Sequence, residues 1–225
     1  MSHLLRRTRA GLAAVPLALA LSVGLVGPTP AVAAAGDSYS APLDTAIGDL
    51  RVAAEVRTGY SRSLFPHWVD DDGDGCHTRN EVLLAEADDP PTVTGTCTIT
   101  GGRWFSYYDR VSWYQTSDVD IDHMVPLAEA WDSGARSWTT STRRAFANDL
   151  GDYRSLVGVT DNVNQAKGDK DIAGWLPTYD RCRYLREFVA VKLRWRLDVD
   201  TAELAAMRDL AGSCTNSTIT VTRAR

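Results

Sequence analysis

The sequence predicts an α+β fold whose core runs strand, helix, strand, helix through residues 119–176. A run of strand-forming residues at 119–125 ends at Pro126, which has no backbone N–H to continue a ladder. A second strand is predicted at 156–160, and apolar residues recur at helical spacing within 180–197. The chain has 225 residues, 44% hydrophobic and 24% charged, which excludes a disordered, collagen-like or coiled-coil protein.

Shorter elements are predicted before this core. Apolar residues fit a helical stripe over 41–58 that ends at Gly59. A short helix is expected at 80–87. Strand-forming residues at 93–100 and 103–107 flank Gly101 and Gly102, which predicts a β-hairpin between these two strands.

Helices are predicted at 127–131, 140–150, 180–197 and 201–211, and residues 161–170 are a polar stretch. Tyr184, Phe188, Val191 and Trp195 share one face of the long helix, so that face is expected in the core. For the organisation of the chain we expect a signal peptide at 1–35, an N-terminal subdomain with an acidic loop at 36–100, the functional core at 101–215 and a tail at 216–225.

The first 35 residues have the pattern of a secretory signal peptide. Three arginines precede an apolar run from Ala10 to Val26, and small residues at 31–35 suit signal peptidase. A membrane anchor is the alternative, because a run of about 17 residues is at the short end for a span. Breaks such as Pro16 favour cleavage. We therefore expect a secreted, extracellular protein with no membrane contact in its mature form.

The charge of the chain excludes a general attraction to polyanions. The formal charge is −5, and the first 35 residues hold three arginines and no acidic residue. The cleaved chain would therefore be still more acidic, and any binding of nucleic acid would need a local site.

The four cysteines predict disulfides. Cys76, Cys97, Cys182 and Cys214 are even in number and include no C-x-x-C pair, so a zinc knuckle is not expected. In an exported protein they predict two disulfide bonds. Three pairings are open, and we favour Cys76–Cys97 and Cys182–Cys214 because each closes a local loop.

A dense polar cluster lies inside the apolar frame at 120–126. Side chains alternate along a strand, so Asp120 and Asp122 face one way and His123 the other unless the strand ends or bulges there. An aspartate of this segment and Asn164 of the second polar segment could hold one hard divalent cation through oxygen. A neutral His123 could then take a proton from water that attacks phosphorus.

These segments resemble a known family. The pattern D-h-D-H-h-V-P-L at 120–127, followed by N-x-x-K-G-D at 164–169, is similar to the HNH, or ββα-metal, nucleases. It is most similar to the GmrSD-type C-terminal HNH family, including secreted actinobacterial members. Further matches lie at Asp72–Leu83, Thr100–Trp104, Leu127–Ala135, Phe146–Asp149, Trp175–Pro177 and Val189–Trp195.

The resemblance implies a ββα-metal core in a mostly helical domain with a short N-terminal hairpin. It implies His123 as general base and Asp122 and Asn164 as ligands of Mg²⁺ or Mn²⁺; we add Asp120 to the metal set. Lys167 replaces a histidine that is common in the family and is expected to contact phosphate. The asparagine that usually braces the histidine has no clear counterpart, since the matching stretch is Arg-Ser-Leu at 154–156.

An acidic loop predicts a second, structural metal site. Asp70, Asp72, Asp74 and Glu81 fit the template of a calcium-binding loop in register, with Gly75 at the turn position. The alternative is a solvated acidic turn held by Cys76.

Six basic residues gather in a short segment and are candidates for contact with the phosphate backbone: Arg181, Arg183, Arg186, Lys192, Arg194 and Arg196. The alternative is an ordinary solvated face paired with carboxylates.

Together these observations predict a secreted, metal-dependent endonuclease that cuts DNA, with RNA as a further substrate, at low sequence specificity. The partner is nucleic acid, and a monomer is expected. The rival hypothesis is a non-enzymatic, calcium-stabilised extracellular binding module whose nuclease site has decayed. Hydrolysis of another ester is less favoured, because the sequence has no G-x-S-x-G nucleophile motif.

Overall fold

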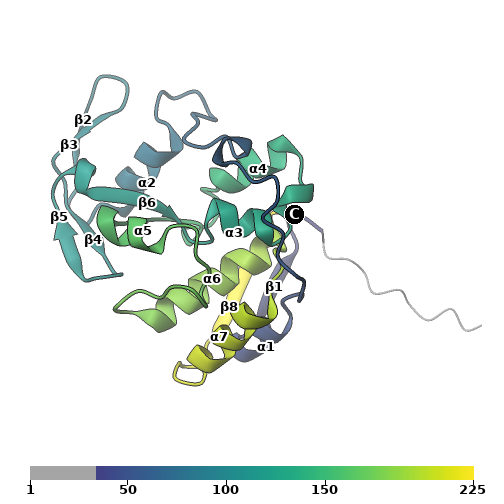
Figure 1. Ribbon diagram of the computed structural model, residues 1–225. Coiled ribbons are helices and arrows are strands. Elements are labelled where there is room, and N and C mark those ends of the chain that lie inside the picture. The colour runs from purple at the N-terminus through teal and green to yellow at the C-terminus, as the bar shows by residue number, and fades with distance from the viewer. Residues whose placement is uncertain (1–33) are drawn as a thin grey trace, which may run out of the picture. The chain divides into compact units, whose positions relative to one another are not determined.

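The computed structural model describes residues 34–225 (Figure 1). The predicted signal peptide, and with it the alternative of a membrane anchor, falls on residues outside this range apart from its last two positions. The elements follow in the order β1 Ser38–Pro42, α1 Leu43–Gly48, η1 Arg62–Leu64, α2 Thr78–Glu86, β2 Thr92–Thr94, β3 Thr98–Thr100, β4 Trp104–Ser106, β5 Val111–Trp113, η2 Thr116–Asp118, β6 Val119–His123, α3 Leu127–Asp132, η3 Ala135–Ser137, α4 Thr140–Ala147, β7 Leu156–Thr160, α5 Asp161–Lys167, α6 Arg181–Trp195, α7 Thr201–Ala211 and β8 Thr218–Thr222.

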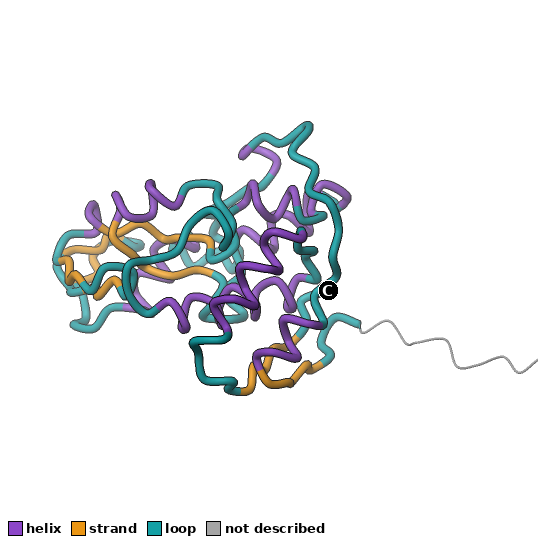
Figure 2. Tube along the Cα trace, turned by 60° about the horizontal axis from the view of Figure 1, so that its bottom comes forward, coloured by secondary structure: helices purple, strands orange, loops and turns teal. Residues whose placement is uncertain are grey.

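The α+β class is confirmed. Within residues 34–225 the strands pair as four antiparallel two-stranded sheets, β1–β8, β2–β3, β4–β5 and β6–β7. Figure 2 shows the β1–β8 pair apart from the other strands, with helices packed between them. Along the stretch that the structure describes, no helix combines the length and the apolar character needed to cross a bilayer.

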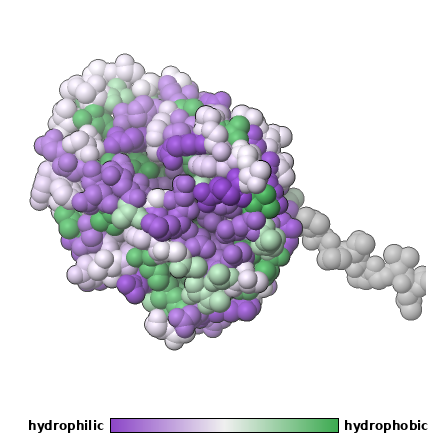
Figure 3. All heavy atoms as spheres, viewed as in Figure 1, coloured by the Kyte–Doolittle hydropathy of each residue, from purple (hydrophilic) through white to green (hydrophobic). Residues whose placement is uncertain are grey.

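Helix α6 lies in the main hydrophobic core. The predicted core stripe is confirmed, since Tyr184, Phe188, Val191 and Trp195 are each at most 4% exposed. The same core takes in residues of α1, α3, α4, α7 and the β1–β8 pair. A smaller cluster, which includes Leu83 of α2 and Trp104 of β4, packs against β6 and β7 and so supports the strands that carry the polar motif. The face of the molecule that Figure 3 shows is largely hydrophilic, with scattered apolar groups.

Two local predictions are wrong where tertiary contacts override periodicity. The helix expected at 41–58 ends at Gly48, because the chain beyond it is extended and Val52 forms a bridge to Val199. The hairpin expected between 93–100 and 103–107 does not form. Instead, the first segment folds into the β2–β3 hairpin, and β4 of the second segment pairs with β5, which lies after that segment.

Gly102 explains the change of direction between these two hairpins. It has a φ of +94°, and a Cβ there would lie 2.8 Å from the buried ring of Trp104. Only glycine fits so close to that ring in a left-handed conformation. The chain therefore turns Trp104 into the core before β4 pairs with β5.

The ends of the described chain are joined. Strand β8 lies in the segment expected to be a tail, and it pairs with β1 across the whole of both strands. The predicted disulfides Cys76–Cys97 and Cys182–Cys214 are both present, with Cα–Cα distances of 5.2 and 5.5 Å. The first joins the acidic loop to the β2–β3 hairpin and the second joins α6 to the end of α7, so both act as local cross-links.

Candidate active site

The two polar segments meet on a strand–strand–helix unit. β6 pairs with β7 so that Asp122 lies opposite Val157 and His123 opposite Leu156, and α5 begins directly after β7. β6 ends at His123. The side chains of Asp122 and His123 can therefore face one site, which an uninterrupted strand would not allow. The polar stretch expected at 161–170 is largely helical, as α5.

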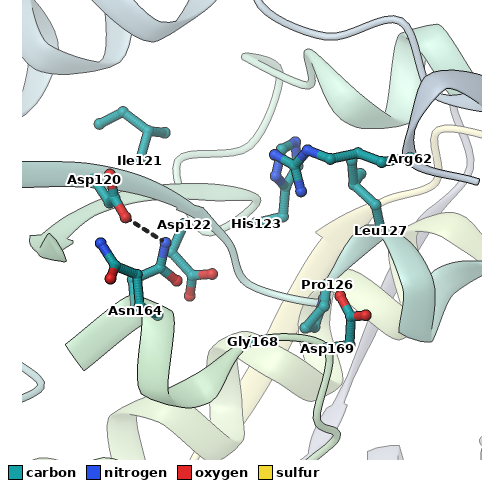
Figure 4. Close-up of a pocket in the computed structure, with 11 residues that line it drawn as sticks. Arg62, Asp120, Ile121, Asp122, His123, Pro126, Leu127, Asn164, Gly168 and Asp169 are labelled. Carbon is teal, nitrogen blue, oxygen red and sulfur yellow. Dashed lines mark hydrogen bonds between the residues drawn. The ribbon is translucent and has the colours of Figure 1, made fainter. Parts of the chain in front are cut away.

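A pocket of about 260 Å³ opens over this unit (Figure 4). It brings together every residue predicted for the metal and the base, Asp120, Asp122, His123 and Asn164, but not Lys167. The lining residues are Arg62, Asp120, Ile121, Asp122, His123, Pro126, Leu127, Asn164, Gln165, Gly168 and Asp169.

Side-chain oxygens that could bind a metal ion face one side of the pocket. Nδ2 of Asn164 donates a hydrogen bond of 3.1 Å to Oδ2 of Asp120, as the dashed line in Figure 4 shows. Oδ2 of Asp122 accepts from the hydroxyl of Tyr108 at 2.6 Å and from Nζ of Lys167 at 2.5 Å. Oδ1 of Asp122 and Oδ1 of Asn164 accept no hydrogen bond from the described residues, so one oxygen of each remains for a ligand.

Lys167 lies beneath the pocket and corrects the expectation of a phosphate contact. Its side chain is fully buried, and Nζ also donates to the carbonyl oxygens of His123 and Met124 at 2.9 and 3.0 Å. With Asp122 these three acceptors use all of its donors. Burial raises the pKa of Asp122, and the Lys167 charge opposes that rise by favouring the carboxylate. Lys167 therefore holds Asp122 and the end of β6 in place.

The hydrogen bond of His123 fixes its tautomer. Nε2 lies 2.9 Å from the carbonyl oxygen of Ala147, at the end of α4. A carbonyl can only accept, so we assign the ring proton to Nε2, which leaves Nδ1 as the lone-pair nitrogen for the pocket. Burial lowers the pKa of His123 to about 3, and the charges of Arg62 and Lys167 act in the same direction. The imidazole is therefore neutral at pH 7.

Asn148, next to Ala147, makes four hydrogen bonds that hold this part of the chain. Its Oδ1 accepts from the backbone N–H of Val69 and the hydroxyl of Thr78, and its Nδ2 donates to the carbonyls of Pro66 and Arg144. These bonds fix the residue that follows Ala147 and hence the carbonyl that orients His123. The F-A-N-D match at 146–149 included this asparagine, but the sequence did not show that the neighbouring Ala147 carbonyl lies against His123.

Residues before the acidic loop form a wall over His123. The Trp68 ring stacks on the imidazole with centroids 5.3 Å apart and an interplanar angle of 28°, and His67 lies edge-on at 6.4 Å. Arg62 lines the same pocket, and its charge acts on the pKa of this ring (Figure 4). These residues were missed because they come from a segment far from the motif in sequence and follow no pattern of their own.

The acidic loop brings its carboxylates together. One oxygen each of Asp70, Asp72 and Asp74 lie within 4.8 Å of one another, and all three residues are exposed. Glu81 lies on α2, where burial and the loop aspartates raise its pKa. The part of that rise that comes from the aspartates reflects the negative charge of the loop.

The basic residues of α6 do not form one surface, which corrects the prediction for two of them. Lys192 is fully buried and pairs with Glu129 and Glu203, both at 2.6 Å. Arg194 is 9% exposed and forms a bidentate pair with Asp149 at 2.7 and 2.8 Å. Both therefore serve the core and cannot reach a phosphate backbone.

The other four basic residues are at least partly exposed. Arg183 and Arg186 line a groove beside Tyr153 and Arg154, although Arg183 is paired with Glu187. Arg181 donates to the carbonyl of Pro177, and Arg196 follows the end of α6. None of the four lines the pocket at His123.

Comparison with known proteins places this geometry in a family. Residues 84–210 match the family described as GmrSD restriction endonucleases, C-terminal domain. A protein of Arthroderma benhamiae, described as an uncharacterized secreted protein, is 48% identical over 158 residues, which cover 69% of this chain and 76% of that protein. This relative is fungal, so it gives no support to the expectation of an actinobacterial member. No solved structure matches the chain significantly. The chain belongs to the family of the C-terminal domains of GmrSD restriction endonucleases.

Proposed function

We propose that this chain is a secreted endonuclease with an HNH, or ββα-metal, site that hydrolyses phosphodiester bonds of DNA, and of RNA as a second substrate, with low sequence specificity. One observation carries the proposal: a neutral imidazole, two carboxylates and an amide oxygen line one pocket on a strand–strand–helix unit. The family match to restriction endonucleases supports the reaction class.

The donor set fits a hard divalent cation. Asp122 and Asn164 each keep one side-chain oxygen free of hydrogen bonds within the described residues, and Asp120 lies beside Asn164. Carboxylate and amide oxygens suit Mg²⁺ or Mn²⁺ rather than a soft metal. Such an ion, when bound, would stabilise negative charge on the phosphorane and the leaving 3′ oxygen.

The remaining chemistry is assigned to the protein. Nδ1 of His123 takes a proton from the attacking water, and the Ala147 carbonyl stabilises the imidazolium through Nε2. Lys167 and Tyr108 hold Asp122 from below, so the carboxylate does not have to reorganise during the reaction. The proton is transferred from water to His123, the water oxygen bonds to phosphorus and the P–O3′ bond breaks, the 3′ oxygen takes a proton from solvent, and the cut end carries a 5′-phosphate.

The test is a cleavage matrix of metals and substrates. Mature protein would be incubated with supercoiled plasmid or single-stranded RNA in Mg²⁺, Mn²⁺, Ca²⁺ or EDTA. We expect cleavage that needs Mg²⁺ or Mn²⁺, is lost in EDTA and falls at least about 10²-fold in His123→Ala. His77→Asn is the matched control, because asparagine can keep the helix cap that His77 provides to α2. Activity that survives both EDTA and His123→Ala would refute the mechanism.

We also propose that the acidic loop holds a structural Ca²⁺ through Asp70, Asp72, Asp74 and Glu81. The convergence of three of these carboxylates supports the proposal. The same observation favours the rival function, a calcium-stabilised extracellular binding module. Thermal stabilisation by Ca²⁺ together with no cleavage under any divalent ion would establish the rival instead of the nuclease.

A further inference from the structure

Five carboxylates from four parts of the chain gather outside the candidate active site. One oxygen each of Glu55, Glu129 and Asp132 lie within 4.8 Å of one another. The same holds for one oxygen each of Glu55, Asp171 and Glu203. Glu129 and Asp132 lie on α3 and Glu203 on α7, while Glu55 and Asp171 follow α1 and α5. Glu55 belongs to both triads, so we treat the five as one carboxylate cluster; none of them lines the pocket of Figure 4.

The carboxylate cluster has more negative charge than its ion pairs compensate. The residues Glu129, Asp132 and Glu203 are 2%, 3% and 0% exposed. Within residues 34–225, two cations pair with the cluster: Lys192 with both glutamates and Arg57 with the aspartate, each at 2.6 Å. Five carboxylates against two cations leave three negative charges when all are ionised. Because buried charge without a partner is costly, the cluster needs protons or a further cation.

The carboxylates of the first triad each keep an oxygen without a hydrogen-bond donor. Oδ2 of Asp132 accepts from its arginine partner, whereas Oδ1 is buried and accepts no hydrogen bond in the described chain. Oε1 of Glu129 accepts from the hydroxyl of Ser133 and from the buried lysine, which leaves Oε2. The side chain of Glu55 makes no hydrogen bond with residues 34–225. Since buried polar atoms normally have partners, these oxygens indicate a ligand.

The backbone on both sides of Glu55 is tied to the elements that carry the other carboxylates. The N–H of Ala53 donates to the carbonyl of Val199, just before α7, at 3.0 Å. The N–H of Val56 donates to the carbonyl of Asp132 at 3.4 Å. Glu55 itself is exposed, so an ion could enter the cluster from solvent on this side.

We propose that Glu55, Glu129 and Asp132 bind one Ca²⁺, which clamps the segment after α1 onto α3. The inference is independent of the proposed nuclease function. All donors of the cluster are carboxylate oxygens, which suit a hard cation. Ca²⁺ takes about six to eight oxygens in a flexible geometry, so it accepts carboxylates from separate elements more readily than Mg²⁺ does. Asp171 and Glu203 add negative charge beside Glu55.

This site should bind Ca²⁺ more weakly than the acidic loop. Lys192 and Arg57 lie at the carboxylate cluster and repel a cation. The four candidate ligands of the acidic loop form no ion pair in the described chain, where only the neighbouring Asp71 is paired. We expect a Kd of about 10⁻⁴–10⁻³ M, the range of extracellular calcium-binding modules. Concentrations that saturate the loop would therefore fill this site only in part.

The test is an NMR titration with Ca²⁺ of protein that carries Glu81→Gln, which disables the loop. The reporter is the amide of Val56, because its N–H donates to the carbonyl of Asp132. We expect a saturable shift of this amide below about 20 mM Ca²⁺. Added Glu55→Gln should raise Kd at least about fivefold, because it removes one ligand charge and keeps the size of the side chain. Added Asp209→Asn is the matched control, since this exposed carboxylate on α7 lies outside the cluster.

Each outcome decides the proposal. A saturable shift that Glu55→Gln weakens at least fivefold, and that Asp209→Asn leaves unchanged, supports it. No saturable shift, or a Kd that Glu55→Gln changes less than fivefold, would overturn it, and protons would then balance the charge of the cluster. Equal weakening by Glu55→Gln and Asp209→Asn would reveal a general attraction to an acidic surface and would overturn it as well. Equal affinity for Mg²⁺ would overturn the assignment to Ca²⁺.

The readout does not involve cleavage, so a failure of the nuclease proposal leaves this test intact. Thermal unfolding without Ca²⁺ checks that every variant is folded. Glu55→Gln should pass this check, because Glu55 is exposed and its side chain makes no hydrogen bond within the described residues.

Discussion

Nζ of Lys167 lies 2.5 Å from Oδ2 of Asp122, and the lysine side chain is fully buried. The pair joins the end of α5 to the end of β6, so it couples the two halves of the candidate site. Because the lysine also holds the His123 and Met124 carbonyls, one amino group fixes both the candidate metal ligand and the backbone of the candidate base. A residue of this kind acts on the reaction through the groups that it positions.

Replacement of Lys167 by methionine should destabilise the fold and abolish cleavage. Methionine has a similar length but leaves the buried Asp122 carboxylate without its cation, which costs about 3–5 kcal/mol in the free energy of unfolding. Urea denaturation measures this change. The double variant Lys167→Met/Asp122→Asn should regain part of the stability, because the uncompensated charge is gone, but no activity. Equal stability of the single and double variants would contradict the assigned role.

Asn148→Ala should lower both stability and kcat. The substitution removes four hydrogen bonds and leaves partly buried backbone groups of the 66–69 segment unpaired, a loss of about 2–4 kcal/mol. The Ala147 carbonyl should then orient His123 less well, and we expect kcat to fall by up to about tenfold.

Asn148→Asp keeps the acceptor for Val69 and Thr78, but it turns a carboxylate oxygen toward the carbonyls of Pro66 and Arg144, so we expect it to be at least as destabilising as Asn148→Ala. Stability is measured by urea denaturation, and kcat at a temperature where all variants are folded. An unchanged kcat in folded Asn148→Ala would show that the asparagine serves the fold alone.

The parts of the fold that follow from local patterns could be predicted from the sequence. The strand at 156–160 and the helix at 201–211 match the observed elements residue for residue. Each has a clear periodicity and a defined boundary, such as Asp200, whose side chain accepts from the backbone N–H of Glu203 and caps α7. Elements that depend on distant partners, such as β1 with β8, gave no local signal.

The candidate site also contains residues that the sequence could name and residues that it could not. Asp122, His123 and Asn164 belong to motifs, so the sequence could name them and the pocket brings them together. The orientation of His123 depends on a backbone carbonyl of Ala147, for which no residue type is required. The contributions of Trp68 and Arg62 depend on where the segment at 61–68 folds, and the sequence does not encode that locally.

A partly buried glutamate should make the stability of the protein fall as pH rises through neutrality. Burial raises the pKa of Glu86 to about 7 from an ordinary value of 4.5, and the hydrogen bond from the Gly158 N–H and the charge of Arg183 only partly offset this. The folded state then holds its proton more tightly than the unfolded state. The resulting stabilisation is complete below pH 4.5 and is lost as pH rises through 7.

The comparison of wild type with Glu86→Gln tests this effect. Glutamine cannot ionise, so its stability relative to wild type should increase by about 1–3 kcal/mol between pH 4.5 and pH 8. Urea denaturation at each pH gives the two profiles, with Asp209→Asn on α7 as an exposed control. Parallel profiles for wild type and Glu86→Gln would refute the prediction.

Calcium should raise the melting temperature through the acidic loop. At a free Ca²⁺ concentration of about 100 times Kd, one site contributes about 2.7 kcal/mol, or roughly 5–10 °C for a chain of this size. Glu81→Gln should remove most of the rise, because glutamine lacks the bidentate carboxylate of the last ligand position. The side chain of Glu81 makes no hydrogen bond with other residues of the described chain, so the variant should fold normally without the ion. Differential scanning calorimetry with and without Ca²⁺ measures the shift, and an equal rise in Glu81→Gln and Asp209→Asn would place the calcium effect elsewhere on this acidic surface.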